Sequence, residues 1–102
     1  RLQDAVQHLA LAVKYLPAQE RILYNYALAL QKLQRRDDAE SAFLKAFSLN
    51  RNSADILYAL AVFYAQDEEW QQAHVYAEKL QKILPEAAGV QQLIQYIDGN
   101  LR

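Results

Sequence analysis

The chain has 102 residues, of which 53% are hydrophobic, and its formal net charge is −1 at pH 7. This balance supports one packed domain and disfavours nucleic acid or an anionic membrane surface as partner, because both require clustered positive charge. The absence of cysteine excludes disulfides, a thiol nucleophile and a thiolate metal site, and no apolar run approaches the ~18 residues of a membrane span. We therefore expect a soluble protein of the cytoplasm or the periplasm.

Apolar residues at three- and four-residue spacing predict a first helix over residues 2–15 that ends before Pro17. In register with the rest of the chain, this segment is the second helix of a repeat whose first helix is missing. The side that the missing helix would cover is expected to be exposed, which suggests self-association. The candidate residues on this side are Val6, Leu9 and Val13. Because the chain opens on Arg1 inside a predicted helix, we expect a piece of a longer protein.

The central part of the chain repeats itself. Residues 20–53 align with residues 54–87 without a gap, at an offset of 34 residues. Matched positions carry identical or similarly sized apolar side chains, and each unit has two amphipathic stretches. Such self-similarity indicates stacked helical hairpins rather than a closed bundle. The helices expected within the two units cover about residues 19–34, 39–50, 54–66 and 70–84.

Polar segments separate these predicted helices. Residues 35–38 are expected to form the first tight turn, with Asp37 opening a capping box for the helix that follows. Ser53 is well placed to cap the third helix. Residues 67–69 mark the next turn, where acidic side chains favour a helix N-terminus. Trp70 is expected to attach the tip of that hairpin to its neighbour, with a role as a binding anchor as the alternative.

A last helix is predicted after Pro85. It has apolar residues on one side and glutamines on the other, as the end of a helical solenoid requires. The expected organisation is one array over residues 1–102, which comprises the second helix of a truncated repeat (1–17), two full repeats (20–53 and 54–85) and a capping helix (86–98).

The pattern resembles the tetratricopeptide repeat, in which W-x2-L-G-x2-Y is followed by A-x3-F and then P. The residues that carry the resemblance are Leu57, Leu60, Ala61 and Tyr64 for the first part, Ala39 and Phe43 for the second, and Pro17 and Pro85 for the last. Alanine replaces the small glycine and leucine replaces the tryptophan. The resemblance implies an all-α solenoid, a right-handed superhelix of about six helices or fewer.

In the resembled family, the first helices of successive repeats line a concave groove that holds a peptide. The resemblance therefore implies a non-catalytic protein-protein interaction module. By register, the candidate peptide-binding residues are Arg21, Tyr24, Asn25, Leu28 and Gln31 on one helix, Asp55, Tyr58, Val62 and Gln66 on the next, and Tyr96 on the last. Tyrosine suits binding because its ring supplies contact area and its hydroxyl a hydrogen bond. Tyr24 and Tyr58 fit simple packing between adjacent helices equally well.

Some members of that family grip a C-terminal carboxylate with Lys and Arg from the groove helices. In this sequence, apolar and aromatic residues stand at the corresponding positions. These residues are Tyr24, Leu28, Tyr58 and Val62. A chaperone-tail ligand is therefore disfavoured.

No motif in the sequence supports catalysis, a cofactor or a metal ion. His8 and His74 lie on separate predicted helices without an acidic partner at ligand spacing, which favours surface roles. There is no Gly-rich phosphate loop, G-x-S-x-G or H-E-x-x-H. We expect no enzyme activity within these residues. The alternative to peptide binding is a structural or self-association module of a larger multidomain protein, whose active part lies elsewhere.

Overall fold

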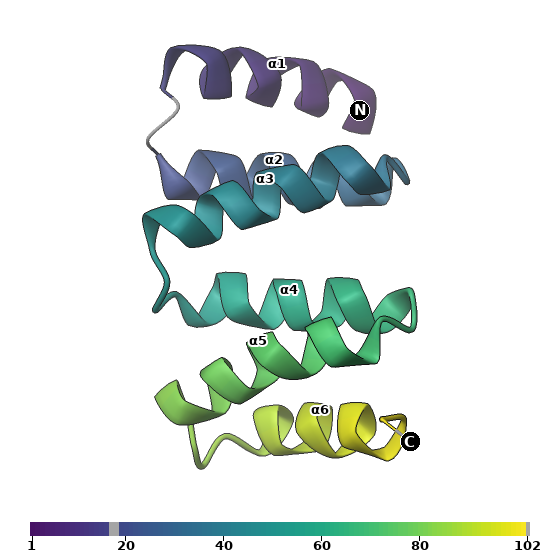
Figure 1. The fold of residues 1–102 in the computed structure, drawn as a ribbon. Helices are drawn as coiled ribbons and strands as arrows, with labels where there is room; N and C mark the ends of the chain where they lie inside the picture. Colours follow the sequence, from purple (N-terminus) through teal and green to yellow (C-terminus); the bar gives the residue numbers. More distant parts are fainter. Residues whose placement is uncertain (17–18, 102) are drawn as a thin grey trace. The chain divides into compact units, whose positions relative to one another are not determined.

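The computed structural model describes residues 1–16 and 19–101. Over these ranges it contains six helices and no strand: α1 (Leu2–Tyr15), α2 (Glu20–Lys32), α3 (Arg36–Leu49), α4 (Ala54–Gln66), α5 (Trp70–Ile83) and α6 (Ala88–Gly99) (Figure 1). The expected all-α class is confirmed. Pro17, which was predicted to end the first repeat, lies outside the described residues.

The chain divides into two compact units, Arg1–Arg51 and Asn52–Arg102, which we call unit 1 and unit 2. In unit 1, α2 packs against both α1 and α3. Leu23, Ala27 and Leu30 recur at helical spacing along α2 and are almost fully buried, as is Phe43 on α3. Ala27 has no exposed surface, and its short side chain lets the helices approach closely.

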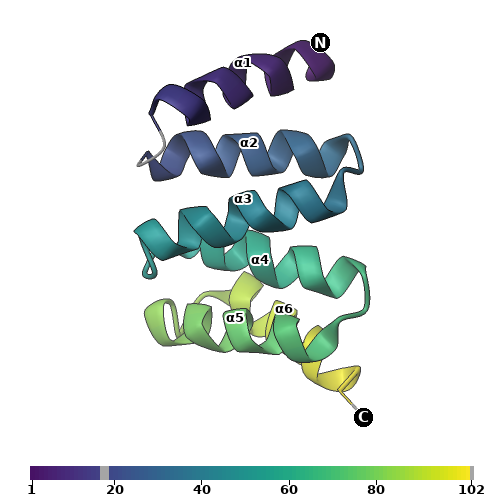
Figure 2. The same ribbon diagram turned by 45° about the horizontal axis from the view of Figure 1, so that its top comes forward.

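In unit 2, α5 packs against both α4 and α6. Figure 2 shows α6 crossing behind α5. The core repeats the pattern of unit 1, since Leu57 and Ala61 on α4 are fully buried. Ala73 on α5 and Ile97 on α6 are fully buried as well. The apolar side predicted for the last helix therefore packs on α5.

The turns of the two hairpins repeat as closely as the side chains do. Gln34 and Glu68 both have positive φ, 61° and 58°, and lie 34 residues apart. The next residue donates its backbone N–H to a carbonyl five residues earlier, from Arg35 to Leu30 and from Glu69 to Tyr64, each at 2.9 Å. This left-handed residue with a 6→1 hydrogen bond is the common way to close a helix C-terminus.

The position of the first turn corrects the sequence prediction. The chain leaves α2 at Leu33 and enters α3 at Arg36, so Asp37 lies inside the helix and not in the turn. The residue at the N-cap is Arg35, and no side chain caps α3. The predicted capping box is wrong because the left-handed residue at Gln34 ends the turn earlier than the run of charges suggests. Acidic residues in the first turn still complement the helix dipole.

The cap predicted for α4 is confirmed. The backbone N–H of Ile56 donates to Ser53 Oγ at 3.4 Å, and Ser53 has extended backbone angles, as an N-cap residue should. The helix begins at Ala54, as expected. In contrast, no side chain caps α5, whose N-cap residue is Glu69.

The side of α1 that is exposed also differs from the prediction. Val6 is only 4% exposed, and Leu9 and Val13 are half-buried, so the stripe expected to be free faces the interior of unit 1. The apolar residues that α1 exposes are on its other side, with Leu11 at 56% and Tyr15 at 72%. The regular apolar stripe packs on α2, and it is the less regular side that remains uncovered.

None of the described helices has the length and apolar character needed to span a membrane.

Replacing Gln34 by glycine should stabilise the first hairpin. A side chain at positive φ costs about 1–2 kcal/mol, part of which is offset by the greater freedom of glycine in the unfolded chain. We expect Gln34→Gly to raise the free energy of unfolding by roughly 0.5–1 kcal/mol in urea denaturation followed by circular dichroism. Gln72→Gly, within α5, should lower it by a similar amount. A destabilised Gln34→Gly variant would contradict this account of the turn.

Candidate functional site

The five candidate residues of unit 1 form one stripe along α2, which we call the α2 strip. They are Arg21, Tyr24, Asn25, Leu28 and Gln31. Arg21 and Asn25 are exposed, and the other three are half-buried. The strip lies beside the buried stripe of the same helix, because a helix of this composition has one side for the core and one that remains accessible.

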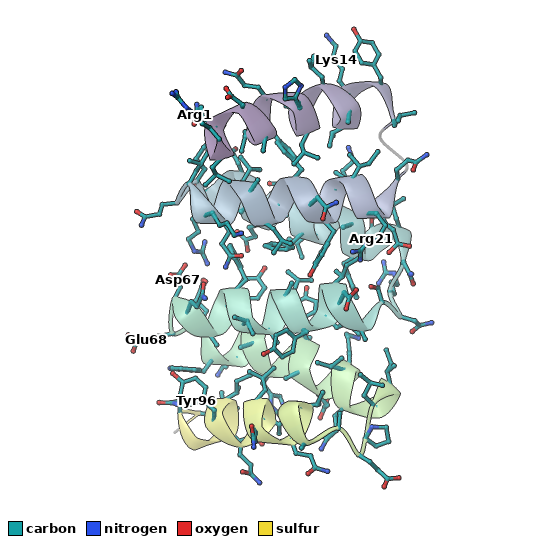
Figure 3. The ribbon with its side chains drawn as sticks, turned by 180° about the vertical axis from the view of Figure 1, so that it is seen from behind. Arg1, Lys14, Arg21, Asp67, Glu68 and Tyr96 are labelled. Atoms are coloured by element: carbon teal, nitrogen blue, oxygen red, sulfur yellow. The ribbon has the colours of Figure 1, made fainter. Side chains whose placement is uncertain are left out.

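Tyr24 has both a packing role and an accessible surface. Its ring meets the buried Phe43 edge-on, with the centroids 6.4 Å apart and the planes at 64°. The guanidinium carbon of Arg21 lies 4.7 Å from the centroid of the same ring, and Figure 3 shows Arg21 on α2. The ring of Tyr24 therefore packs on Phe43 in the core and is partly covered by the guanidinium group of Arg21.

The α4 strip of unit 2 consists of Asp55, Tyr58, Val62 and Gln66. Tyr58 is 49% exposed, and the adjacent Leu57 is fully buried. Asp55 and Gln66 are exposed, and Val62 is half-buried. Tyr58 occupies the repeat position of Tyr24 and is more accessible. Asp55 occupies that of Arg21, so the two strips share their geometry and differ in charge.

Tyr96 lies on α6 and is 59% exposed (Figure 3). Its ring meets Trp70 edge-on, with the centroids 5.4 Å apart and the planes at 79°. Trp70 begins α5, so this contact joins the tip of the hairpin to α6, as predicted for Trp70. In Figure 1, α4 and α6 both lie behind α5, and in Figure 3, which is seen from behind, both lie in front of it. The α4 strip and Tyr96 therefore belong to one side of unit 2.

No acidic partner was predicted for His74 from the sequence, and this prediction is wrong. Its Nδ1 lies 2.9 Å from Asp98 Oδ1 on α6, and its Nε2 lies 3.7 Å from Glu78 Oε2 on α5. Glu78 is four residues further along the same helix and could have been recognised from the sequence, whereas Asp98 is 24 residues away. The carboxylates flank opposite ring nitrogens instead of converging on a point, and no metal-binding cluster occurs among the described residues. His74 links α5 to α6.

Each unit has a cleft that residues of the described ranges line. The cleft of unit 1 has a volume of about 220 Å³ and is lined by Val13 of α1, Leu23 and Tyr26 of α2, and Asp38, Ser41, Ala42 and Lys45 of α3. The cleft of unit 2 has a volume of about 370 Å³ and is lined by Glu68 and Glu69, the first turn of α5 from Trp70 to Gln72, and Asn100 and Leu101. Sequence reasoning found neither cleft, because each joins residues from separate elements.

The packing of Tyr24 predicts that the two equivalent tyrosines contribute unequally to stability. Tyr24→Ala removes the contact with Phe43 and should lower the free energy of unfolding by about 2 kcal/mol. Tyr58→Ala should change it by less than about 1 kcal/mol, because half of the side chain is exposed. Tyr24→Phe keeps the ring contact and serves as the control in the same urea titration. Equal losses for the two alanine variants would contradict the assigned packing.

The sequence matches no protein-family model and no curated protein. The structure is similar to the first TPR domain of Spaghetti (RPAP3), solved with an HSP90 peptide of sequence SRMEEVD. That match has a TM-score of 0.86 and 18% identity and covers 98% of this chain and 81% of the other. The structure is also similar to MamA protein, with a TM-score of 0.90 and 24% identity over 97% of this chain and 54% of that chain. This chain thus spans about half the length of the MamA chain. The chain has the all-α fold of tetratricopeptide-type helical hairpins.

Proposed function

We propose that the chain is a non-catalytic protein-interaction module that binds a peptide or a helix of a partner protein on the strips of its units. The observation that carries this proposal is the exposure of Tyr58 and Tyr96 on helices whose opposite sides are buried. Large aromatic residues that a fold leaves accessible on rigid helices are characteristic of binding surfaces.

The composition of the strips suits an extended polypeptide. Each tyrosine offers an apolar ring and a hydroxyl group at a small cost in side-chain entropy. The amides of Asn25 and Gln66 can donate to and accept from a peptide backbone. Helices in a packed hairpin hold these groups in place before binding, which lowers the entropic cost of association. The peptide bound by the similar TPR domain supports this use of the fold by analogy.

A random peptide library displayed on phage provides the direct test. Peptides selected on the intact chain should bind in isothermal titration calorimetry, and Tyr58→Ala should weaken the best of them by about tenfold or more. Val75→Ala is the matched control, since Val75 on α5 is exposed to a similar extent but lies outside the strips. Selected peptides that bind Tyr58→Ala as well as the parent chain would remove Tyr58 from the site. Failure to select any saturable peptide would overturn peptide binding itself.

The charge of the strips predicts that the peptide SRMEEVD is not a ligand of this chain. The positions where a carboxylate clamp would need Lys or Arg hold Tyr24, Leu28, Tyr58 and Val62. Calorimetric titration with SRMEEVD should therefore show no saturation, and the same peptide with an amidated C-terminus should behave identically. Saturable binding that is lost on amidation would show that a clamp exists elsewhere on the chain.

The alternative function is self-association, for which the apolar side of α1 that carries Leu11 and Tyr15 is the relevant surface. Sedimentation equilibrium separates the two functions. A chain that remains monomeric across concentrations rejects self-association through α1. A concentration-dependent dimer that is lost in Leu11→Ser, Tyr15→Ser supports it, and Val75→Ser is the control for loss of an exposed apolar residue.

A further inference from the structure

The charges of the chain are unequally divided between its two units. Residues 1–51 contain eight Lys or Arg and five Asp or Glu, a net charge of +3. Residues 52–102 contain three basic and seven acidic residues, a net charge of −4. The overall charge of −1 conceals this difference. A surface of one sign attracts partners of the opposite sign and excludes those of its own.

Among the described residues of unit 2, the helices that carry Tyr58 and Tyr96 contain no basic residue. Of the three basic residues of unit 2, Lys79 and Lys82 belong to α5, and Arg102 lies outside the described residues. Neither α4, the turn after it, nor α6 contains Lys or Arg. Tyr58 and Tyr96 therefore receive no cation from their own helices. Unit 1 differs, because Arg21 of the α2 strip lies over the ring of Tyr24.

The cleft of unit 2 combines the groups that recognise a cation. Trp70 supplies an indole, the aromatic side chain that attracts cations most strongly. Glu68 and Glu69 supply carboxylates beside it, and none of the described lining residues is basic. The ring of Tyr96 extends the aromatic surface from Trp70 across the accessible side of α6. A cleft of about 370 Å³ has room for the end of a Lys or Arg side chain.

One contribution opposes a cation in this cleft. Trp70 begins α5, and a helix N-terminus carries a partial charge of roughly +0.5. The carboxylate of Glu68, which lines the same cleft, carries a full negative charge that exceeds this partial charge. Because the site is open to solvent, each ionic contact is weak on its own. A preference for basic ligands must therefore come from several charges along the ligand as well as from the one that enters the cleft.

We propose that unit 2 binds a basic segment of a partner protein, with one Lys or Arg side chain of that segment in the cleft beside Trp70 and Glu68. The inference rests on the proposed function, since it names the charge of the segment that the module accepts. It also predicts a ligand of opposite charge to the acidic end of the peptide held by the similar TPR domain.

Three synthetic peptides test the charge. They have the same uncharged sequence except at a few shared positions. These positions carry Lys and Arg in the first peptide, Gln in the second and Glu in the third. In fluorescence anisotropy, the Lys/Arg peptide should bind about tenfold or more tightly than the Glu peptide, with the Gln peptide between them. Its affinity should fall as NaCl is raised from about 0.05 M to about 0.5 M. Trp70 is the single tryptophan of the chain, so unlabelled Lys/Arg peptide should also change its intrinsic emission.

Two matched variants test the cleft. Glu68→Gln should weaken the Lys/Arg peptide by roughly three- to fivefold. Glu86→Gln makes the same change in the net charge of unit 2 outside the cleft lining and should have less than about a twofold effect. Circular dichroism of both variants verifies that the fold is retained.

The outcomes separate this inference from the proposed function. If the Gln or Glu peptide binds as tightly as the Lys/Arg peptide, the proposed preference for a basic segment is overturned. The proposed peptide binding still stands if the affinity of these peptides depends on Tyr58. Tight binding of the Lys/Arg peptide without a change in Trp70 emission, or with equal effects of the two Gln variants, overturns the cleft. Absence of binding by all three peptides overturns the inference alone, because the phage-displayed library decides peptide binding independently.

Discussion

The structure depends on the burial of one side of each helix against a neighbour. Leu23, Ala27 and Leu30 on α2 are almost fully buried, as are the equivalent residues of α4. Alanine at the closest approach allows the helices to pack without a gap, and an interior at this density tolerates little change in volume. Because the hairpin covers only one side of the helix, the other side stays accessible. The candidate strips are a direct consequence of this division.

The repeat is a property of the backbone as well as of the side chains. Both α2 and α4 end with a residue in the left-handed conformation and a 6→1 backbone hydrogen bond, at positions 34 residues apart. Neither Gln34 nor Glu68 is a residue type that favours positive φ. The packed hairpin holds both in this conformation, because the helices on either side fix the path of the chain. In unit 2, the turn also brings the acidic residues to the start of α5, where the cleft lies.

The repeat positions provide geometry, and the residues at the accessible positions provide the chemistry. Tyr24 and Tyr58 occupy the same position in successive units, yet Tyr24 packs under Arg21, and Tyr58 follows Asp55 on its helix. A fold shared with other tetratricopeptide-type structures therefore does not determine a shared ligand. The chemistry of each strip depends on a few accessible side chains, of which Tyr24 also packs on the core.

The sequence by itself determined the features that depend on local geometry. The apolar spacing predicted the six helices and Ser53 was identified as a cap, because both involve residues within one or two turns of each other. The repeat was found by comparing two segments of the sequence directly, which requires no knowledge of contacts between them. Alignment of the repeats also identified Tyr24 and Tyr58 as residues at the same position of successive units.

Only the tertiary structure decided which elements meet. It placed Val6 in the interior, paired His74 with Asp98, and set Trp70 against Tyr96. Helical periodicity shows which residues share a face, but the choice of the face that is covered depends on packing between elements that are distant in the chain. The clefts and the side of α1 that remains exposed follow from that packing, and no local pattern in the sequence encodes them.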